Sequence, residues 1–314
     1  MNLKNKSVLV TGGAGFIGSH LVNRLVKENP KKIIVVDNFY LGKLRNVKTK
    51  YAKICSDNAA SQETMQKIIS KYNVEVIFNL AVIPLPVSLT EPKFGFDMNV
   101  NITMTMCELL RLKSYETLIH FSSSEVYGTS EYVPMDEKHP LNGITPYAAS
   151  KAASDLLVLS YCRTFGIDAS IVRPFNTYGP RQNDKSYAGI IPLTINRLLK
   201  HEPLVIQGSG KQTRDFSYVT DVVDGAVKIY ECLDSRGKVV NIASGKEITM
   251  EQIIKTINTE KLPIVYESKR MGDVDQHLAD ISLAIKLINY SPSVNFRDGI
   301  EKTKKWYIDS MKQR

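Results

Sequence analysis

A tyrosine and a lysine, Tyr147 and Lys151, stand one helical turn apart in PYAASKAASD, and three serines lie upstream in FSSSEVYG. Side chains at this spacing share one face of a helix, so both can reach the same reacting atom. A free tyrosine has a pKa of about 10, and a neighbouring ammonium lowers it. Tyr147 is therefore a candidate base for a substrate hydroxyl, with a serine to hydrogen-bond the same oxygen.

A glycine-rich turn near the N-terminus predicts a bound dinucleotide, which would take a hydride while Tyr147 takes the proton. The segment TGGAGFIGSH places Gly12, Gly15 and Gly18 between a strand pattern and a helix pattern. Such glycines let backbone approach a pyrophosphate at the start of the helix. Asp37 ends the next strand pattern, about 20 residues on, where a carboxylate binds the adenosine ribose and disfavours the 2′-phosphate of NADP. We therefore expect NAD, which accepts hydride from the substrate carbon.

Apolar segments alternate with helical patterns through the first half of the chain. The apolar segments lie at 7–12, 32–38, 74–81, 117–123 and 168–175. This alternation predicts an α/β fold, a Rossmann-like doubly wound parallel sheet covered by helices on both faces. After about residue 176 shorter, turn-rich pieces follow. We expect an NAD-binding domain over 1–176, to which a strand at 238–244 returns, and a smaller mixed α/β substrate domain over 177–314.

Composition excludes several classes of protein. The 314 residues include 43% hydrophobic residues but no apolar run long enough for a transmembrane helix, and no signal-peptide pattern follows the N-terminus. Four cysteines lie far apart without metal-binding spacing, which is typical of reduced thiols in a cytoplasmic protein. The net charge of +9 comes from scattered lysines rather than a basic stripe. We expect no membrane, no metal and no nucleic acid.

The chain resembles the extended short-chain dehydrogenases/reductases that act on nucleotide sugars, such as UDP-glucose 4-epimerases. The resemblance covers nearly the whole chain, in family order, through TGGAGFIGSH, DNFYLGKLRNV, NLA, SSSEVYG, PYAASK, RPFNTYGPRQ, TRDFSYVTDV and RMGDVDQHLADIS. It implies tightly held NAD, a UDP- or GDP-linked sugar substrate, and a homodimer formed through the helices around 99–113 and 147–165.

The resemblance also assigns roles by position. It implies that Ser123 is the catalytic hydroxyl beside Tyr147 and Lys151, and leaves Glu125 either catalytic or structural. The cofactor contacts that it implies are Gly12, Gly15, Phe16, Ile17, Gly18, Asp37, Asn38, Asp57, Asn58, Leu80, Ala81, Asn99, Ser122, Tyr147, Lys151 and Phe175. The substrate contacts that it implies are Ser123, Asn176, Arg214, Arg270 and Asp273.

Members of this family share oxidation at C4 of the sugar and then diverge. Ser124 and Glu125 stand where the commonest 4,6-dehydratases have two acids, which disfavours that type, whereas RMGDVDQHLADIS is most similar to 4-epimerases. We expect a 4-epimerase. Alternatives are 4,6-dehydration, C4 dehydrogenation with release of NADH, decarboxylation of UDP-glucuronate, and an inactive NAD-binding scaffold.

The segment AVIPLPVSLTEP departs from the family pattern. Pro84 and Val87 occupy positions that are commonly polar, and we expect a proline-stiffened loop with an apolar side toward the sugar.

Overall fold

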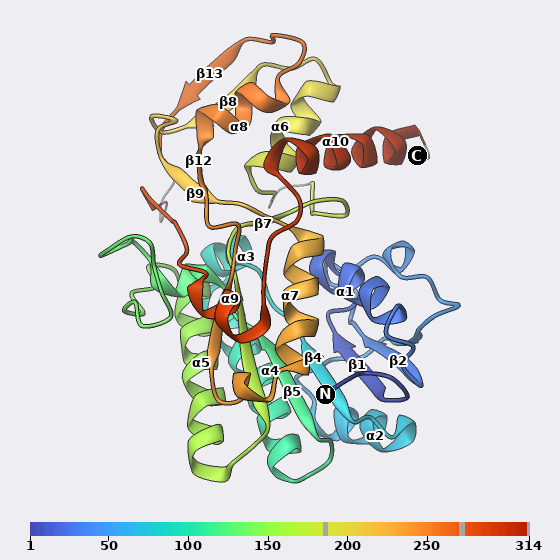
Figure 1. Cartoon of the computed structure of the whole chain (residues 1–314). Helices are drawn as coiled ribbons and strands as arrows, with labels where there is room; N and C mark the ends of the chain where they lie inside the picture. The colour runs from blue at the N-terminus through green and yellow to red at the C-terminus, as the bar shows by residue number, and fades with distance from the viewer. Residues whose placement is uncertain (185–187, 270–273, 313–314) are drawn as a thin grey trace.

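A seven-stranded parallel sheet forms the centre of the molecule (Figure 1). The computed structural model describes residues 1–184, 188–269 and 274–312. The sheet has the order β11-β6-β5-β4-β1-β2-β3. Its strands are β1 (Ser7–Thr11), β2 (Lys32–Val36), β3 (Lys53–Cys55), β4 (Val76–Asn79), β5 (Thr117–Phe121), β6 (Ala169–Pro174) and β11 (Val239–Ile242). The expected fold class, a doubly wound parallel sheet, is confirmed.

The strand order reverses between β1 and β4, because the chain winds outward from β1 in both directions. In open parallel sheets, the loops after the strands at such a point enclose a crevice where ligands bind. The loops that follow β1 and β4 carry Gly12 and Leu80, so the topology brings together residues predicted to contact the cofactor.

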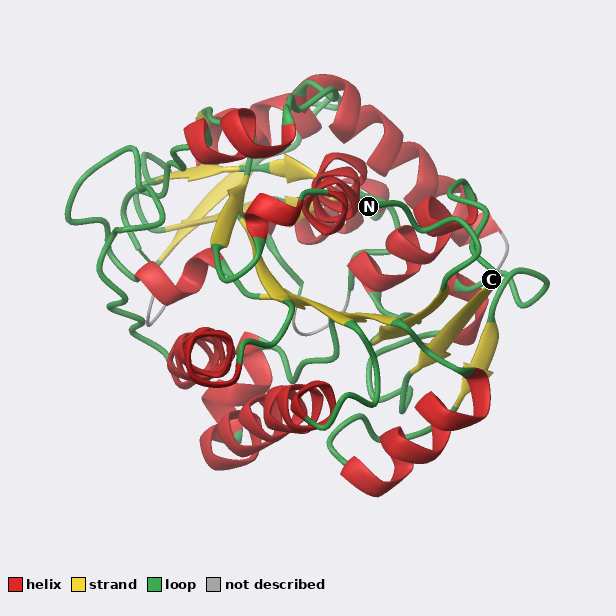
Figure 2. Ribbon diagram, turned by 60° about the horizontal axis from the view of Figure 1, so that its bottom comes forward, coloured by secondary structure: helices red, strands yellow, loops and turns green. Residues whose placement is uncertain are grey.

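Two layers of helices cover the sheet, one on each face (Figure 2). Side chains alternate along β1: Val8 and Val10 pack toward one layer, whereas Leu9 packs toward the other. The first layer consists of α1 (Phe16–Val26), α7 (Val219–Glu231) and α9 (Ser282–Ile288). The second consists of α2 (Gln62–Tyr72), α4 (Pro92–Arg111) and α5 (Pro146–Phe165).

A second, smaller part packs around its own core at one end of the molecule (Figure 1). Its helices are α6 (Ile190–Leu199), α8 (Met250–Ile257) and α10 (Phe296–Lys312). Short two-stranded pairings accompany them: β8 (Leu204–Gln207) with β13 (Ile264–Glu267), β9 (Thr213–Asp215) with β12 (Glu247–Thr249), and β7 (Thr177–Tyr178) with β10 (Ser217–Tyr218). Short 3-10 turns lie at η1 (Leu44–Asn46), η2 (Ser124–Tyr127) and η3 (Leu233–Ser235).

The chain after residue 176 contributes to both parts. Strand β11 pairs with β6, and α7 and α9 pack against the central sheet, whereas α6, α8 and α10 build the smaller core. The chain therefore crosses between the two cores several times. Within the described residues, no helix combines the length and the apolar character needed to span a bilayer.

The segment after β4 differs from the expected loop. It forms the short helix α3 (Leu85–Thr90), which begins after Pro84 and carries Pro86 in its first turn. Proline is tolerated there because the first amide groups of a helix have no intrahelical acceptor. Val87 lies on the inner side of α3 and is only 2% exposed, so it does not face a sugar.

Candidate active site

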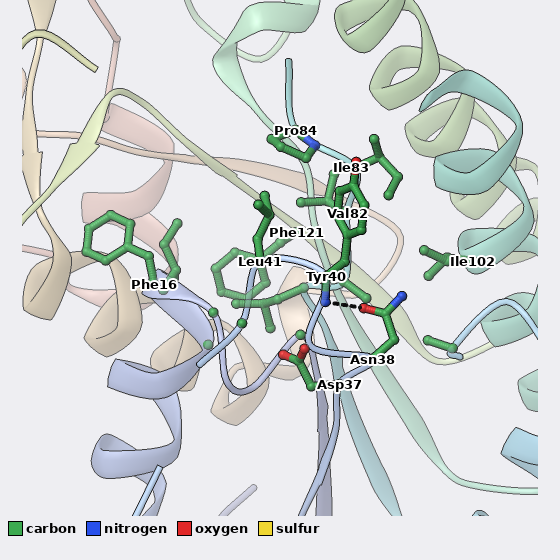
Figure 3. Close-up of a pocket in the computed structure, with 18 of the residues that line it drawn as sticks. Phe16, Asp37, Asn38, Tyr40, Leu41, Val82, Ile83, Pro84, Ile102 and Phe121 are labelled. Carbon is green, nitrogen blue, oxygen red and sulfur yellow. Dashed lines mark hydrogen bonds between the residues drawn. The ribbon is translucent and has the colours of Figure 1, made fainter. Parts of the chain in front are cut away.

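A cavity of about 340 Å³ lies at the carboxyl ends of the central strands (Figure 3). Most of the residues predicted to contact the cofactor line this single cavity. They are Gly12, Gly15, Phe16, Ile17, Gly18, Asp37, Asn38, Asp57, Asn58, Leu80, Ala81, Ser122, Tyr147 and Lys151. Figure 3 shows Asp37 and Asn38 on one segment of the wall, and Val82, Ile83 and Pro84 on another. The strand order thus assembles a site from segments distant in sequence.

The glycine turn leaves no room for a side chain at Gly12 or Gly18. A Cβ at Gly18 would lie 2.2 Å from the carbonyl oxygen of Gly12, so α1 packs directly against the turn. Gly12 has φ +65°, and a Cβ there would lie 2.9 Å from the backbone of Ala81. The turn and the loop after β4 therefore meet backbone to backbone. This packing places the start of α1, where a pyrophosphate binds in turns of this type, on the cavity wall.

Asp37 supports the turn as well as lining the cavity. Its carboxylate accepts hydrogen bonds from the amides of Ala14, at 2.9 Å, and Phe39, at 2.8 Å. Burial raises the pKa of Asp37, and these backbone hydrogen bonds oppose the rise. The carboxylate thus fixes the turn to the end of β2 while one edge of the residue remains on the cavity.

Tyr147 and Lys151 lie in the first turns of α5, at the end of the cavity formed by β5. Thr145 caps this helix, because its side chain accepts a hydrogen bond from the amide of Ala148 at 3.1 Å. The Lys151 ammonium donates to the carbonyl oxygen of Phe121, the last residue of β5. The helix cap and this bond hold both side chains beside the serine-rich strand end.

The pKa values of this pair differ from the sequence-based expectation. Burial raises the pKa of Tyr147 to about 12; a hydrogen bond from Ser123 opposes this, and the charges of Glu125 and Asp155 add to it. Burial lowers the pKa of Lys151 to about 8, and the Asp155 carboxylate opposes that shift. The ammonium of Lys151 therefore does not by itself bring Tyr147 toward pH 7. Burial is the largest influence on the pKa of Tyr147.

A buried carboxylate beneath the cavity organises the surrounding polar groups. Asp155 is fully buried and accepts hydrogen bonds from Ser122, at 2.6 Å, and Arg173, at 2.7 Å. The Arg173 guanidinium lies over the ring of Tyr127, 4.6 Å from its centroid. Sequence reasoning missed Asp155, although its place one turn after Lys151 on the same helix face was a usable signal.

Several predicted residues lie beside the cavity rather than on its wall. Asn99 is buried and brackets the loop after β4, accepting from the amide of Ile83 at 2.7 Å and donating to its carbonyl at 3.1 Å. Phe175 is also buried, with its ring 5.5 Å from that of His277. Ser123 is near Tyr147, to which it hydrogen-bonds.

Two of the predicted substrate residues, Asn176 and Arg214, meet at β9. Asn176 donates to the carbonyl of Asp215 at 3.2 Å, and the neighbouring Arg214 donates to the carbonyl of Thr213 at 2.8 Å. Asn176 is bonded to β9 and Arg214 is part of it, so the two residues lie together. Arg270 and Asp273 lie outside the described residues. Glu125 lies close enough to Tyr147 for its charge to raise the tyrosine pKa.

Sequence reasoning missed part of the cavity wall. Arg181 and Asn183 reach it from the segment after β7, and Tyr40, Leu41 and Lys43 from the loop after β2. The first two are distant in sequence from the glycine turn. Arg181 lies in the block RPFNTYGPRQ, to which the resemblance assigned no contact by this residue, and no motif includes Asn183. Arg181 and Asn183 lie near the glycine turn because the segment after β7 passes across α1.

Comparison with known proteins agrees with this geometry. The family model described as GDP-mannose 4,6 dehydratase matches residues 9–303. A protein from Methanocaldococcus jannaschii that carries the provisional name UDP-glucose 4-epimerase is 35% identical over 303 residues, covering 95% of this chain and 97% of the relative.

Solved structures with similar folds include nucleotide-sugar enzymes. The UDP-N-acetylglucosamine 4-epimerase from Methanobrevibacter ruminantium, in complex with UDP-N-acetylmuramic acid, has a TM-score of 0.91 and 32% identity, covering 98% of this chain and 100% of that one. The Thermus thermophilus UDP-glucose 4-epimerase complex with NAD has a TM-score of 0.88 and 27% identity, covering 96% and 99%. Other relatives include UDP-glucuronic acid decarboxylases from Arabidopsis thaliana and a dTDP-glucose 4,6-dehydratase from Streptomyces venezuelae. The chain therefore belongs to the GDP-mannose 4,6-dehydratase family of short-chain dehydrogenase/reductase-type epimerases and dehydratases, as its sequence blocks predicted.

Proposed function

We propose that the protein is an NAD-dependent nucleotide-sugar 4-epimerase. It oxidises C4 of a UDP-linked sugar to a ketone and reduces the ketone on the opposite face. The observation that carries this proposal is the meeting of Ser123, Tyr147 and Lys151 at the end of a cavity that begins at the glycine turn. Epimerases among the relatives support this choice, and decarboxylases and dehydratases among them keep the other reactions of the family as alternatives.

The residues of the cavity fit NAD. Gly12 and Gly18 stand where a Cβ would collide with backbone, and α1 starts at that turn. Asp37 fits the adenosine ribose, with Asp57 and Asn58 near the adenine end of the same cavity. NAD held there would supply the acceptor and later the donor of the C4 hydride, and its positive ring would favour the ionised form of Tyr147. Phe175 and Asn99 act from behind the wall, by supporting the segments that line it.

The chain's own residues then handle the proton. Tyr147 removes the proton of the C4 hydroxyl and later gives it back to the carbonyl oxygen. Ser123 hydrogen-bonds to Tyr147 and to the same substrate oxygen. Lys151 carries positive charge at neutral pH, because its pKa is about 8, and so stabilises the ionised form of Tyr147.

The substrate diphosphate belongs near β9 in this proposal. Arg214 and Asn176 supply a guanidinium and an amide there. One guanidinium can donate two parallel hydrogen bonds to the oxygens of a phosphate. Arg270 and Asp273 remain proposed contacts. A UDP linkage is favoured because the similar solved structure from Methanobrevibacter ruminantium holds UDP-N-acetylmuramic acid.

A second candidate reaction is favoured by Glu125. Its charge is close enough to Tyr147 to raise the pKa of that tyrosine, and C5 and C6 would lie near a sugar C4 hydroxyl that contacts the tyrosine. A base there would assist dehydration, or position the carboxylate of a uronic acid for loss as carbon dioxide. Both would begin with the same C4 oxidation.

The division of the chain and its assembly belong to the same proposal. Residues 1–176, with β11, form the NAD-binding part, and most of 177–314 forms the sugar-binding part. Helices α4 and α5 carry exposed apolar side chains, including Met104 and Leu156, and we expect them to pair in a homodimer. We expect the enzyme to act in the cytoplasm, where its product would supply polysaccharide synthesis.

The direct test is incubation with UDP-, GDP-, CDP- and dTDP-linked sugars followed by NMR of the products. Inversion at C4 is the expected result with a UDP-sugar. Loss of the C6 oxygen would identify a dehydratase, loss of carbon dioxide a decarboxylase, and accumulation of NADH a dehydrogenase. Absence of turnover with every sugar would contradict the enzymatic proposal.

A further inference from the structure

The segment after β7 contacts elements on both sides of the glycine turn, α1 on one side and the loop after β2 on the other. The carbonyl oxygen of Pro180 is 2.9 Å from Nε2 of His20 on α1. The amide oxygen of Asn23, also on α1, accepts from both terminal nitrogens of Arg181, at 2.8 and 3.1 Å, in the amide orientation that satisfies both residues. On the other side, Asp184 lies 4.0 Å from the ammonium of Lys43. The segment therefore crosses from α1 to the loop after β2.

These attachments hold the Arg181 guanidinium at the cavity wall. Arg181 lines the cavity together with Gly15, Phe16 and Ile17 at the start of α1. Its backbone has φ +69°, an uncommon conformation for a residue with a side chain. The orientation is fixed by Asn23, a neutral partner that leaves the positive charge uncompensated.

The electrostatic surroundings of Arg181 favour an anion. Burial lowers the pKa of its guanidinium, and no carboxylate within 1–184, 188–269 and 274–312 counteracts that effect. A partly buried cation is costly unless it is paired. The amide groups at the start of α1 add positive potential on the same side of the cavity.

We propose that Arg181 binds the pyrophosphate of the dinucleotide, beside the glycine turn at the start of α1. This inference rests on the proposed NAD-dependent function. The pyrophosphate carries two negative charges, and the planar guanidinium offers it paired hydrogen bonds that lysine does not reproduce. The segment 179–184, which we call the strap, crosses α1. It adds a contact to the cofactor site from outside residues 1–176.

The test uses full-length protein freed of bound nucleotide and titrated calorimetrically with NAD, ADP-ribose and adenosine. Arg181→Gln should weaken NAD and ADP-ribose binding about tenfold or more and leave adenosine binding unchanged. Arg181→Lys should recover part of the loss. The matched control is Arg297→Gln, on the exposed start of α10, which should bind all three ligands as the parent does.

The other outcomes separate this inference from the proposed function. Unchanged NAD and ADP-ribose affinity in Arg181→Gln would overturn the role of Arg181 while leaving NAD dependence intact. An equal loss for adenosine would also overturn it, because Arg181 would then only shape the strap. Tight NADP binding that only Arg181→Gln loses would assign the guanidinium to a 2′-phosphate instead. Failure of the parent protein to bind NAD would overturn the proposed function itself.

Discussion

At the scale of single residues, the site is a balance between desolvation and charge. Tyr147 and Lys151 are both perturbed by burial, in directions that favour the neutral form of each. Asp155 opposes the shift at Lys151 and increases the one at Tyr147. At neutral pH Tyr147 is therefore neutral, whereas Lys151 is still charged because its pKa is about 8. In the proposed mechanism the bound cofactor favours the ionised form of Tyr147.

Replacing Tyr147 with phenylalanine removes only the reacting hydroxyl. We expect Tyr147→Phe to lower kcat by about 10²–10⁴-fold, the usual contribution of a positioned acid–base group. Cofactor binding should be retained, because the ring and its helix remain in place. Steady-state turnover and the nucleotide content of the purified variant measure the two effects. Activity equal to that of the parent would rule out Tyr147 as the base.

The pKa of Lys151 predicts the alkaline side of the pH profile. Its pKa is lowered to about 8, so the ammonium loses its proton above about pH 8 and no longer stabilises ionised Tyr147. We therefore expect kcat to fall as pH rises through that value. Asp155→Asn removes the negative charge that raises the pKa of Lys151, so the fall should begin at lower pH.

The control for this prediction is Asp309→Asn, an exposed position on α10 that should leave the profile unchanged. Thermal unfolding of Asp155→Asn shows whether the variant remains folded, since Arg173 loses its charged partner. An alkaline midpoint shared by the parent and a folded Asp155→Asn variant would contradict the role given to Asp155.

At the scale of elements, regular segments could be predicted and short or irregular ones could not. The long apolar strands could be predicted from their apolar pattern. The helices that carry Gly18 and Tyr147 could be predicted from their period and their helix-start signals. Strand β3 was missed because it is three residues long and begins with an exposed lysine. Helix α3 was taken for a loop because of its prolines, which in fact occupy its start.

The cofactor half of the site was likewise more predictable than the rest. Glycine spacing and the strand-end acid constrain backbone shape directly, so Gly12, Gly18 and Asp37 follow from local pattern. Arg181 and Asp155 depend on how distant segments meet, or on what lies beneath the cavity wall. Such placements are set by tertiary packing rather than by the order of residues.

The contact between α1 and the glycine turn makes Gly18 the most constrained position of that element. Gly18→Ala places a Cβ 2.2 Å from the Gly12 carbonyl oxygen, so the helix must move. We expect a loss of about 1–3 kcal/mol in the free energy of unfolding, measured with urea, and weaker NAD binding by calorimetry. Gly189→Ala, at the cap of α6, is the control, because the nearest atom would be 3.6 Å away. Equal stability of both variants would contradict this account of the turn.

At the scale of the whole molecule, the helix that carries Tyr147 and Lys151 also lies at the surface. Helix α5 carries Tyr147 and Lys151 at its start, while Leu156 is 57% exposed further along. Its neighbour α4 exposes Met104 beside it in the same layer. A homodimer through these helices would bury the exposed apolar side chains and immobilise the helix that positions the reacting groups.

Disrupting this face should change the assembly. We expect Leu156→Glu to convert a dimer into a monomer in sedimentation velocity, because a buried unpaired carboxylate is costly. Leu233→Glu, at an even more exposed leucine (61%) outside α4 and α5, should sediment as the parent does. A dimer that persists in Leu156→Glu would place the interface elsewhere.

The central claim is that hydride leaves C4 of a sugar and returns to C4 from the other face. The most direct measurement is therefore to supply the UDP-sugar that the enzyme converts with deuterium at C4, and to locate the label in the product by NMR. The account predicts a C4 epimer that keeps the deuterium at C4. Deuterium found at C6, or released on free NADH, would contradict epimerisation, and an epimer that had lost the label to water would contradict hydride transfer altogether.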